Sequence, residues 1–211
     1  MKIIAISDTH TMERSIRDIP DGDVLIHAGD ITGNGQSWQI IEFCNWIKEL
    51  PHKHKIVIAG NHDSCFEKDN KNRNVVIDYI NNVATYLEDS EIIIDGIKFY
   101  GSPWQPEFCN WSFNLPRGKA LKEKWDLIPL DTQVLITHGP PANILDWCPG
   151  GNVGCLDLKI AMQNLVNLKA HIFGHIHEGY GIEVIGGTTY ANASICNDKY
   201  NPINKPIVVE I

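Results

Sequence analysis

Residues 3–10 of the chain read Ile-Ile-Ala-Ile-Ser-Asp-Thr-His, a short apolar run that leads directly into two residue types able to bind a metal. The same arrangement recurs at residues 24–30, Val-Leu-Ile-His-Ala-Gly-Asp, and at residues 56–63, Ile-Val-Ile-Ala-Gly-Asn-His-Asp. Such runs, bounded by glycine and polar residues, predict buried strands. Residues 37–50 carry apolar side chains at helical spacing and end just before Pro51, which predicts a helix. A strand, a helix and a strand in this order predict a parallel βαβ unit.

The rest of the chain continues the α/β pattern. Asp95-Gly96 separates two apolar runs within residues 92–100, which is typical of a hairpin with a type I′ turn. Further strands are predicted at residues 134–137 and 171–173 and, as an antiparallel group, at 182–185, 188–191 and 207–211, with a helix around 156–168. Because no repeat or linker interrupts this pattern, we expect one α/β domain over residues 1–211, with a mixed sheet.

The composition limits the classes of ligand. The 211 residues include 18 Lys and Arg against 26 Asp and Glu, which gives a formal net charge of −8. An acidic surface disfavours long nucleic acids, because their binding depends on neutralising phosphates, but a small phosphate compound stays open. Six cysteines without a Cys-x-x-Cys pair are interpreted as free thiols, and no apolar run has the length of a signal peptide core or a membrane span. We therefore expect a cytoplasmic protein with no membrane partner.

Residues able to bind a metal follow five of the predicted strands. They are Asp8, His10, Asp30, Asn61, His138, His175 and His177. Each histidine taken alone would be interpreted as structural, but the repeated pattern favours a metal centre at one edge of the sheet. In extended backbone, the two residues of each Asp-x-His or His-x-His pair would point to the same side. Nitrogen and oxygen ligands without thiolate suit Mn, Fe, Co, Ni or Zn, and seven candidates suit two ions, roughly 3.5–4 Å apart, that share one carboxylate.

The motifs SDTH (7–10), AGD (28–30), GNHD (60–63), ITHGPP (136–141) and GHIH (174–177) together resemble those of the calcineurin-like metallophosphoesterases. The resemblance extends over essentially the whole chain. It is greatest to the small branch of metallophosphoesterase-domain-containing proteins, through stretches such as GSPWQPEFCNWSFNLPRG (101–118) and the C-terminal tail. It implies a four-layer α/β/β/α sandwich with mixed β-sheets, and a metal-dependent phosphoesterase.

The resemblance also implies a role for each candidate. Asp8, His10 and His177 would bind one ion, Asn61, His138 and His175 would bind a second, and Asp30 would bridge both. His62 would act on the substrate, as general acid to the leaving oxygen or as a stabiliser of charge. The protein phosphatases of this superfamily continue their Gly-Asp motif as Gly-Asp-x-x-Asp-Arg-Gly, whereas residues 29–35 read GDITGNG. The residue that would orient His62 is therefore unassigned, and a protein phosphatase is disfavoured.

The implied activity is hydrolysis of a small phosphodiester, such as a 2′,3′-cyclic nucleotide, by a metal-bridging hydroxide, with Mn²⁺ the first candidate ion. A phosphomonoesterase or nucleotide pyrophosphatase on the same ligands, and a non-catalytic protein-binding scaffold, are the alternatives. Neither the physiological substrate nor the oligomeric state follows from the sequence.

Aromatic side chains crowd the connection that begins at residue 101. Trp104, Phe108, Trp111 and Phe113 either stack on a nucleobase, with Arg117 near a phosphate, or cover the hydrophobic edge of the sheet, which we favour. The candidate substrate contacts are Asn61, His62, Trp111 and Arg117. Other polar residues are set aside: we expect His27 to be packed, His52 and His54 to be solvated, and Asp63 to support its loop.

Overall fold

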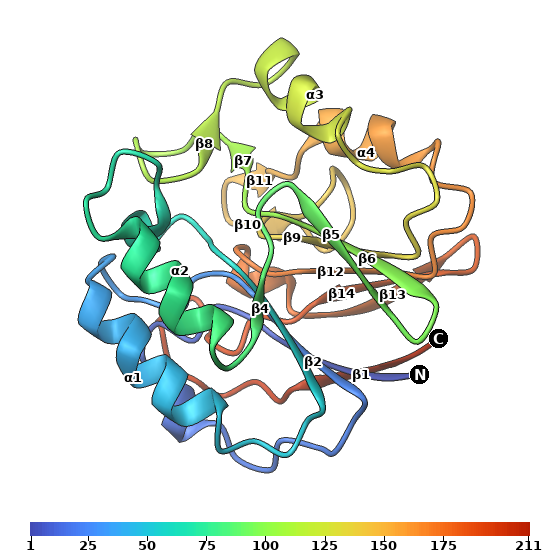
Figure 1. The fold of residues 1–211 in the computed structure, drawn as a ribbon. Coiled ribbons are helices and arrows are strands. Elements are labelled where there is room, and N and C mark those ends of the chain that lie inside the picture. Colours follow the sequence, from blue (N-terminus) through green and yellow to red (C-terminus); the bar gives the residue numbers. More distant parts are fainter.

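Two mixed β-sheets pack face to face in the computed structural model, which describes residues 1–211 (Figure 1). The first sheet has five strands, in the spatial order β15 (Ile207–Glu210), β1 (Lys2–Ile6), β2 (Val24–Ala28), β3 (His54–Ile58) and β4 (Thr85–Tyr86). Strands β1 to β4 are parallel, and β15 is antiparallel to β1. The predicted parallel βαβ unit is therefore confirmed.

The second sheet has six strands, in the order β13 (Gly181–Ile185), β14 (Thr188–Asn192), β12 (Ala170–Phe173), β9 (Val134–Thr137), β6 (Ile97–Ser102) and β5 (Ser90–Ile94). Its central strands are parallel, and both edge strands are antiparallel to their neighbours. Asp95 and Gly96 have φ angles of 47° and 80°, as the predicted type I′ turn between β5 and β6 requires. Two short pairs lie outside the sheets: β7 (Gln105–Pro106) with β8 (Asn114–Leu115), and β10 (Trp147–Cys148) with β11 (Gly151–Asn152).

Helices form the two outer layers (Figure 1). The first sheet is covered by α1 (Ser37–Ile47) and α2 (Arg73–Asn81), and the second by α3 (Lys119–Trp125) and α4 (Leu156–Met162). Single 3₁₀ turns are η1 (Glu13–Ser15), η2 (Ser64–Phe66) and η3 (His177–Gly179). The layers follow the order α/β/β/α that the family resemblance implies. None of the helices combines the length and the apolar character needed to cross a bilayer.

The central strands are buried on both faces. In β1, Ile3 and Ala5 enter the core between the sheets, and Ile4 and Ile6 enter the core beneath α1 and α2. In β9, Leu135 faces α3 and α4 while its neighbours on the strand face the first sheet. This double burial explains why these strands are uninterrupted apolar runs in the sequence.

Three expectations about the elements need correction. The single mixed sheet is two sheets, because an apolar run records burial and not the identity of its neighbouring strands. For the same reason, the grouping of β15 with the other C-terminal strands is wrong, and β15 instead joins the first sheet. Helices α1 and α4 end at Ile47 and Met162, earlier than predicted, because Leu50 after α1, and Leu165 and Leu168 after α4, still pack against the core and continue the apolar pattern past each helix.

Candidate metal centre

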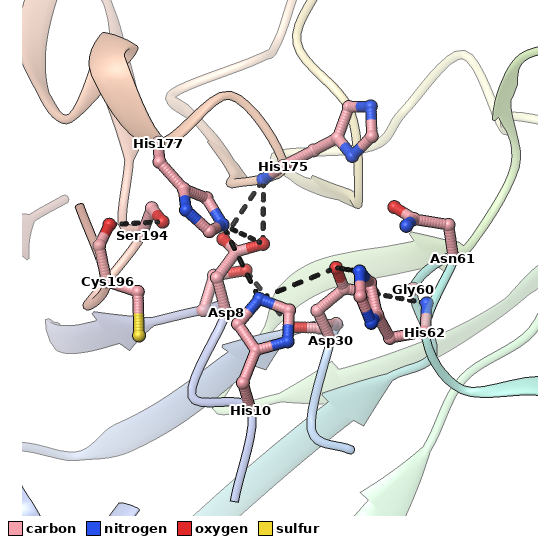
Figure 2. Close-up of polar contacts among 12 residues, drawn as sticks. Asp8, His10, Asp30, Gly60, Asn61, His62, His175, His177, Ser194 and Cys196 are labelled. Atoms are coloured by element: carbon pink, nitrogen blue, oxygen red, sulfur yellow. Dashed lines mark hydrogen bonds and ion pairs between the residues drawn. The ribbon is translucent and has the colours of Figure 1, made fainter. Parts of the chain in front are cut away.

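Loops that follow β1, β2, β3, β9 and β12 bring the seven candidate ligands to one end of the sandwich, and Figure 2 shows most of them pointing toward one another. In each of three groups, the potential ligand atoms lie within 4.8 Å of one another: Asp8 with His10 and His177, His10 with Asp30 and His62, and Asp30 with His138 and His175. Asn61 joins the last group, because its Oδ1 lies 3.0 Å from Nε2 of His138. Asp30 therefore lies between two clusters of ligand atoms.

Tight loop conformations, and not extended backbone, orient these side chains. Asp8, His10, Asp30 and His175 have φ angles of 53°, 45°, 56° and 69°, in the left-handed region. We expected extended backbone to turn both side chains of each Asp-x-His or His-x-His pair to one side, but the backbone at these residues is not extended. In addition, His175 and His177 do not share a group of potential ligand atoms.

Glycines beside the ligands allow the loops to approach closely. A Cβ atom at Gly60 would collide with the Asp30 carboxylate, and one at Gly174 would collide with the Asp8 carboxylate. The backbone N–H of His175 can then donate to both oxygens of Asp8, at 3.1 and 3.0 Å. Gly60 and Gly174 are therefore required by the packing around the two carboxylates.

Backbone carbonyls determine which ring nitrogen carries the proton in three of the four ligand histidines. Nδ1 of His10 lies 3.2 Å from the Thr32 carbonyl, and Nδ1 of His177 lies 2.8 Å from the Asn197 carbonyl. A carbonyl only accepts, so each Nδ1 donates and each Nε2 presents a lone pair. The two Nε2 atoms face each other at 3.5 Å, and Asp8 Oδ1 lies 3.6 Å from Nε2 of His177. Three acceptors that face one another fit a bound cation.

In the second cluster, a backbone carbonyl likewise holds the Nδ1 proton of a ligand histidine. Nδ1 of His138 donates to the Ala28 carbonyl at 2.9 Å, so its Nε2 presents a lone pair. This Nε2 faces Asp30 Oδ1 at 3.4 Å and Asn61 Oδ1 at 3.0 Å. Carbonyls that hold the Nδ1 protons are the usual support for metal-binding imidazoles, so the residues present fit a metal ion in each cluster.

The electrostatics of the clusters favour positive charge. Burial disfavours a charged His138, but the Asp30 carboxylate more than offsets this effect, and the pKa of His138 is raised to about 9. The pKa of His177 is likewise raised to about 9, because hydrogen bonding and charge from Asp8 outweigh burial. His175 has no carboxylate so close, and burial lowers its pKa to about 4. A cation would therefore replace protons that these carboxylates already attract.

His62 lies beside the clusters, and its orienting partner is a backbone carbonyl. Its Nδ1 donates to the Gly33 carbonyl at 2.9 Å, and its backbone N–H donates to Asp30 Oδ1 at 2.8 Å. The loop that carries Gly33 is held by Asp63, whose carboxylate accepts the backbone N–H groups of Ile31 and Thr32 in that loop and of Gly60 in its own. The supporting role predicted for Asp63 is confirmed, and the partner of His62 is supplied by the GDITGNG segment that lacks the phosphatase Asp and Arg.

A cavity of about 510 Å³ opens over the clusters. Phe108 and Trp111, which are 53% and 41% exposed, line it, and the Trp111 ring lies over His62 with centroids 4.2 Å apart. Trp104 and Phe113 instead pack against the core beneath α1 and α2. The favoured covering role is thus correct for Trp104 and Phe113 and wrong for the other two aromatics.

Arg117 lines the same cavity but is already engaged. Its Nη1 donates to the Gly154 carbonyl at 2.9 Å, and its Nη2 donates to the Val153 carbonyl at 2.7 Å. In this structure it joins two loops of the cavity wall.

Comparison with known proteins assigns the family. Residues 1–179 match the model of the calcineurin-like phosphoesterase family. The chain belongs to this family. It is therefore a metal-dependent phosphoesterase, as the motifs predicted.

Curated relatives place this calcineurin-like phosphoesterase in a branch. It is 44% identical over its full length to "Metallophosphoesterase domain-containing protein 1" of Homo sapiens and covers 71% of that protein. It is 40% identical over its full length to "UPF0046 protein K07C11.7" of Caenorhabditis elegans and covers 75% of it. The solved structure of TT1561 of Thermus thermophilus shares the fold, with a TM-score of 0.62 at 16% identity over 90% of this chain and 88% of that one.

Some contributors to the phosphoesterase site were missed by sequence reasoning. Backbone carbonyls of Ala28, Thr32, Gly33 and Asn197 orient the histidines, and any residue type could supply them. Tyr200, which lines the cavity, was also missed.

The predictions for the histidines outside the metal centre are confirmed only in part. His27 is buried and bonded to Thr9, as predicted. His52 is buried and donates to the Pro20 carbonyl, so its predicted solvation is wrong, because the chain folds over it. His54 is half-buried at the start of β3, so its solvation is only partial.

Proposed function

We propose that this phosphoesterase hydrolyses small phosphodiesters, including 2′,3′-cyclic nucleotides, with two divalent ions. Asp8, His10 and His177 would hold one ion, Asn61, His138 and His175 the other, and Asp30 would bridge both. The observation that carries this proposal is the position of Asp30, whose carboxylate groups with His138 and His175 on one side and, on the other, with His10, which also belongs to the group of Asp8 and His177. The nitrogen and oxygen ligands suit Mn²⁺ first, and Fe, Co, Ni or Zn as alternatives.

The reaction adds one water across a P–O bond. When bound, two divalent ions lower the pKa of a shared water and polarise the phosphoryl oxygens. The water oxygen bonds to phosphorus, and the leaving oxygen gains a proton to give an alcohol and a phosphomonoester. His62 would donate this proton from Nε2 as an imidazolium, with its Nδ1–H held by the Gly33 carbonyl and its Nε2 beside Asp30, 4.0 Å from Oδ2.

Charge around the cavity supports a phosphodiester substrate over a phosphomonoester or a pyrophosphate. Besides Asp30, the cavity is lined by the carboxylates of Glu107, Glu178 and Asp198, and its one permanent cation, Arg117, is bonded to loop carbonyls. A diester carries one negative charge, whereas a phosphomonoester or a pyrophosphate carries more and is repelled more strongly. We therefore expect a preference for diesters.

The test compares bis-p-nitrophenyl phosphate with p-nitrophenyl phosphate, after chelation and after addition of Mn²⁺. We expect the diester to react faster, no activity in the chelated protein, and recovery with Mn²⁺. A faster monoester reaction would instead support the phosphatase alternative. If the protein binds no metal and hydrolyses neither compound, the result would support the alternative of a non-catalytic protein-binding scaffold.

A further inference from the structure

The segment after β14 lies beyond the part of the chain matched by the family model, and it reaches the proposed metal centre. Ser194 forms a parallel bridge with Ser7, the residue before Asp8, so the chain passes from the second sheet to the end of β1. Through this crossing, residues near the C-terminus approach a site whose other residues all precede position 180.

A tight turn then aims two groups at the centre. Oδ1 of Asn197 accepts the backbone N–H groups of Lys199 and Asn201, at 3.0 and 2.9 Å. The carbonyl of Asn197 accepts the backbone N–H of Tyr200 at 2.9 Å and Nδ1 of His177 at 2.8 Å. Tyr200 has a left-handed φ of 57°, which the closed turn maintains. One turn thus fixes both a proposed ligand and the Tyr200 ring.

The ring of Tyr200 forms a wall of the cavity. It packs edge to face against His10 and His177, with centroid distances of 4.9 and 5.2 Å, and its centroid lies 6.2 Å from that of His62. It nevertheless stays 48% exposed and lines the cavity. Tyr200 therefore borders the space next to the proposed first ion, and Trp111 borders His62 on another side.

The hydroxyl of Tyr200 is an uncommitted hydrogen-bond donor on the cavity wall. The four carboxylates of the lining only accept, and each terminal nitrogen of Arg117 already donates one N–H to a loop carbonyl. The Tyr200 hydroxyl has no hydrogen-bond partner within the chain, whereas that of Tyr180 donates to the Lys205 carbonyl. A phenol keeps its proton at neutral pH, so this donor is free for an anion.

We propose that Tyr200 is a substrate-contacting residue whose hydroxyl donates a hydrogen bond to a phosphoryl oxygen of the bound ester. The inference rests on the proposed function for the presence of that ester. It adds a contact from outside the family motifs, one that needs no change in the metal ligands. A hydrogen bond to a charged oxygen is stronger than one between neutral groups, so its loss has a measurable effect.

The test uses Tyr200→Phe, which removes the hydroxyl and keeps the ring. The matched control is Tyr79→Phe, because Tyr79 is 43% exposed on α2 and does not line the cavity. We expect Tyr200→Phe to lower kcat/KM for bis-p-nitrophenyl phosphate about tenfold or more and to weaken binding of inorganic phosphate, measured by calorimetry on Mn²⁺-loaded protein. Metal content and Tm should match those of the wild type, and Tyr79→Phe should change none of these quantities.

Three results would overturn the proposal. They are an unchanged kcat/KM with unchanged phosphate affinity, an equal effect of Tyr79→Phe, or a loss of metal from Tyr200→Phe, which would make the residue a support of His10 and His177. A wild type inactive on both esters would contradict the proposed function instead, and the comparison of phosphate affinities would still test Tyr200.

Discussion

Among the individual residues, His62 is held on several sides although it is not proposed as a metal ligand. The Gly33 carbonyl holds its Nδ1 proton, and the Trp111 ring covers it at 4.2 Å. Asp30 accepts its backbone N–H, so the carboxylate proposed to bridge the ions also fixes the position of this residue. Such constraints hold a proton donor in one orientation.

We predict that His62→Ala lowers turnover of the diester by about 10²–10⁴-fold. The metal content should stay that of the wild type, because the ligand clusters on both sides of Asp30 are complete without His62. The measurement is steady-state kinetics combined with metal analysis of the same preparation. If the variant loses metal, His62 is a ligand in the group that it forms with His10 and Asp30.

At the scale of the elements, the loops after the strands carry the function. These loops approach one another closely, and their glycines make room for the carboxylates. Gly174, which follows β12, packs against the carboxylate of Asp8, which follows β1, so the two sheets meet at this contact.

We therefore predict that Gly174→Ala weakens metal binding and lowers the free energy of unfolding by about 1–3 kcal/mol, as overpacking does. Gly150→Ala is the matched control, because the nearest atom to its new Cβ would be Cys148 Sγ, at 3.8 Å. Metal titration and chemical denaturation of both variants check this prediction. Wild-type metal affinity in Gly174→Ala would show that the contact between the loops is dispensable.

At the scale of the whole molecule, buried neutral histidines link stability to pH. His171 lies in β12, and its Nε2 lies 2.8 Å from Thr137 Oγ1, whose own proton goes to the Gly139 carbonyl. Burial lowers the pKa of His171 to about 3, whereas an unfolded histidine titrates near 6.5. Between these values the unfolded chain binds more protons, so stability falls as pH falls.

We predict that His171→Gln reduces the dependence of unfolding free energy on pH between about 6.5 and 4. The slope should decrease by up to about 1.4 kcal/mol per pH unit, the value for one proton. Urea denaturation of metal-free wild type and variant across this range gives both slopes. Equal slopes would mean that His171 takes up a proton in the folded protein.

Apolar runs and the residues after them are properties of the local sequence, and they were enough to predict much of the fold and of the candidate site. The longer strands, the type I′ turn, the family and the convergence of Asp8, His10, Asp30, Asn61, His138, His175 and His177 were predicted from it, whereas β4 and the two short pairs outside the sheets were not. The metal roles of these residues, the single domain and the cytoplasmic location stay predictions.

Other features depend on which distant segments meet, and only the tertiary structure decided them. An apolar run does not name its partner strand, so the two sheets were implied only by the family resemblance, and the position of β15 was not predicted at all. The carbonyls of Gly33 and Asn197 orient His62 and His177, yet every residue has a carbonyl, so the sequence carries no signal for them. Tyr200 reaches the cavity because the chain crosses between sheets at Ser194, a path determined by long-range pairing with Ser7.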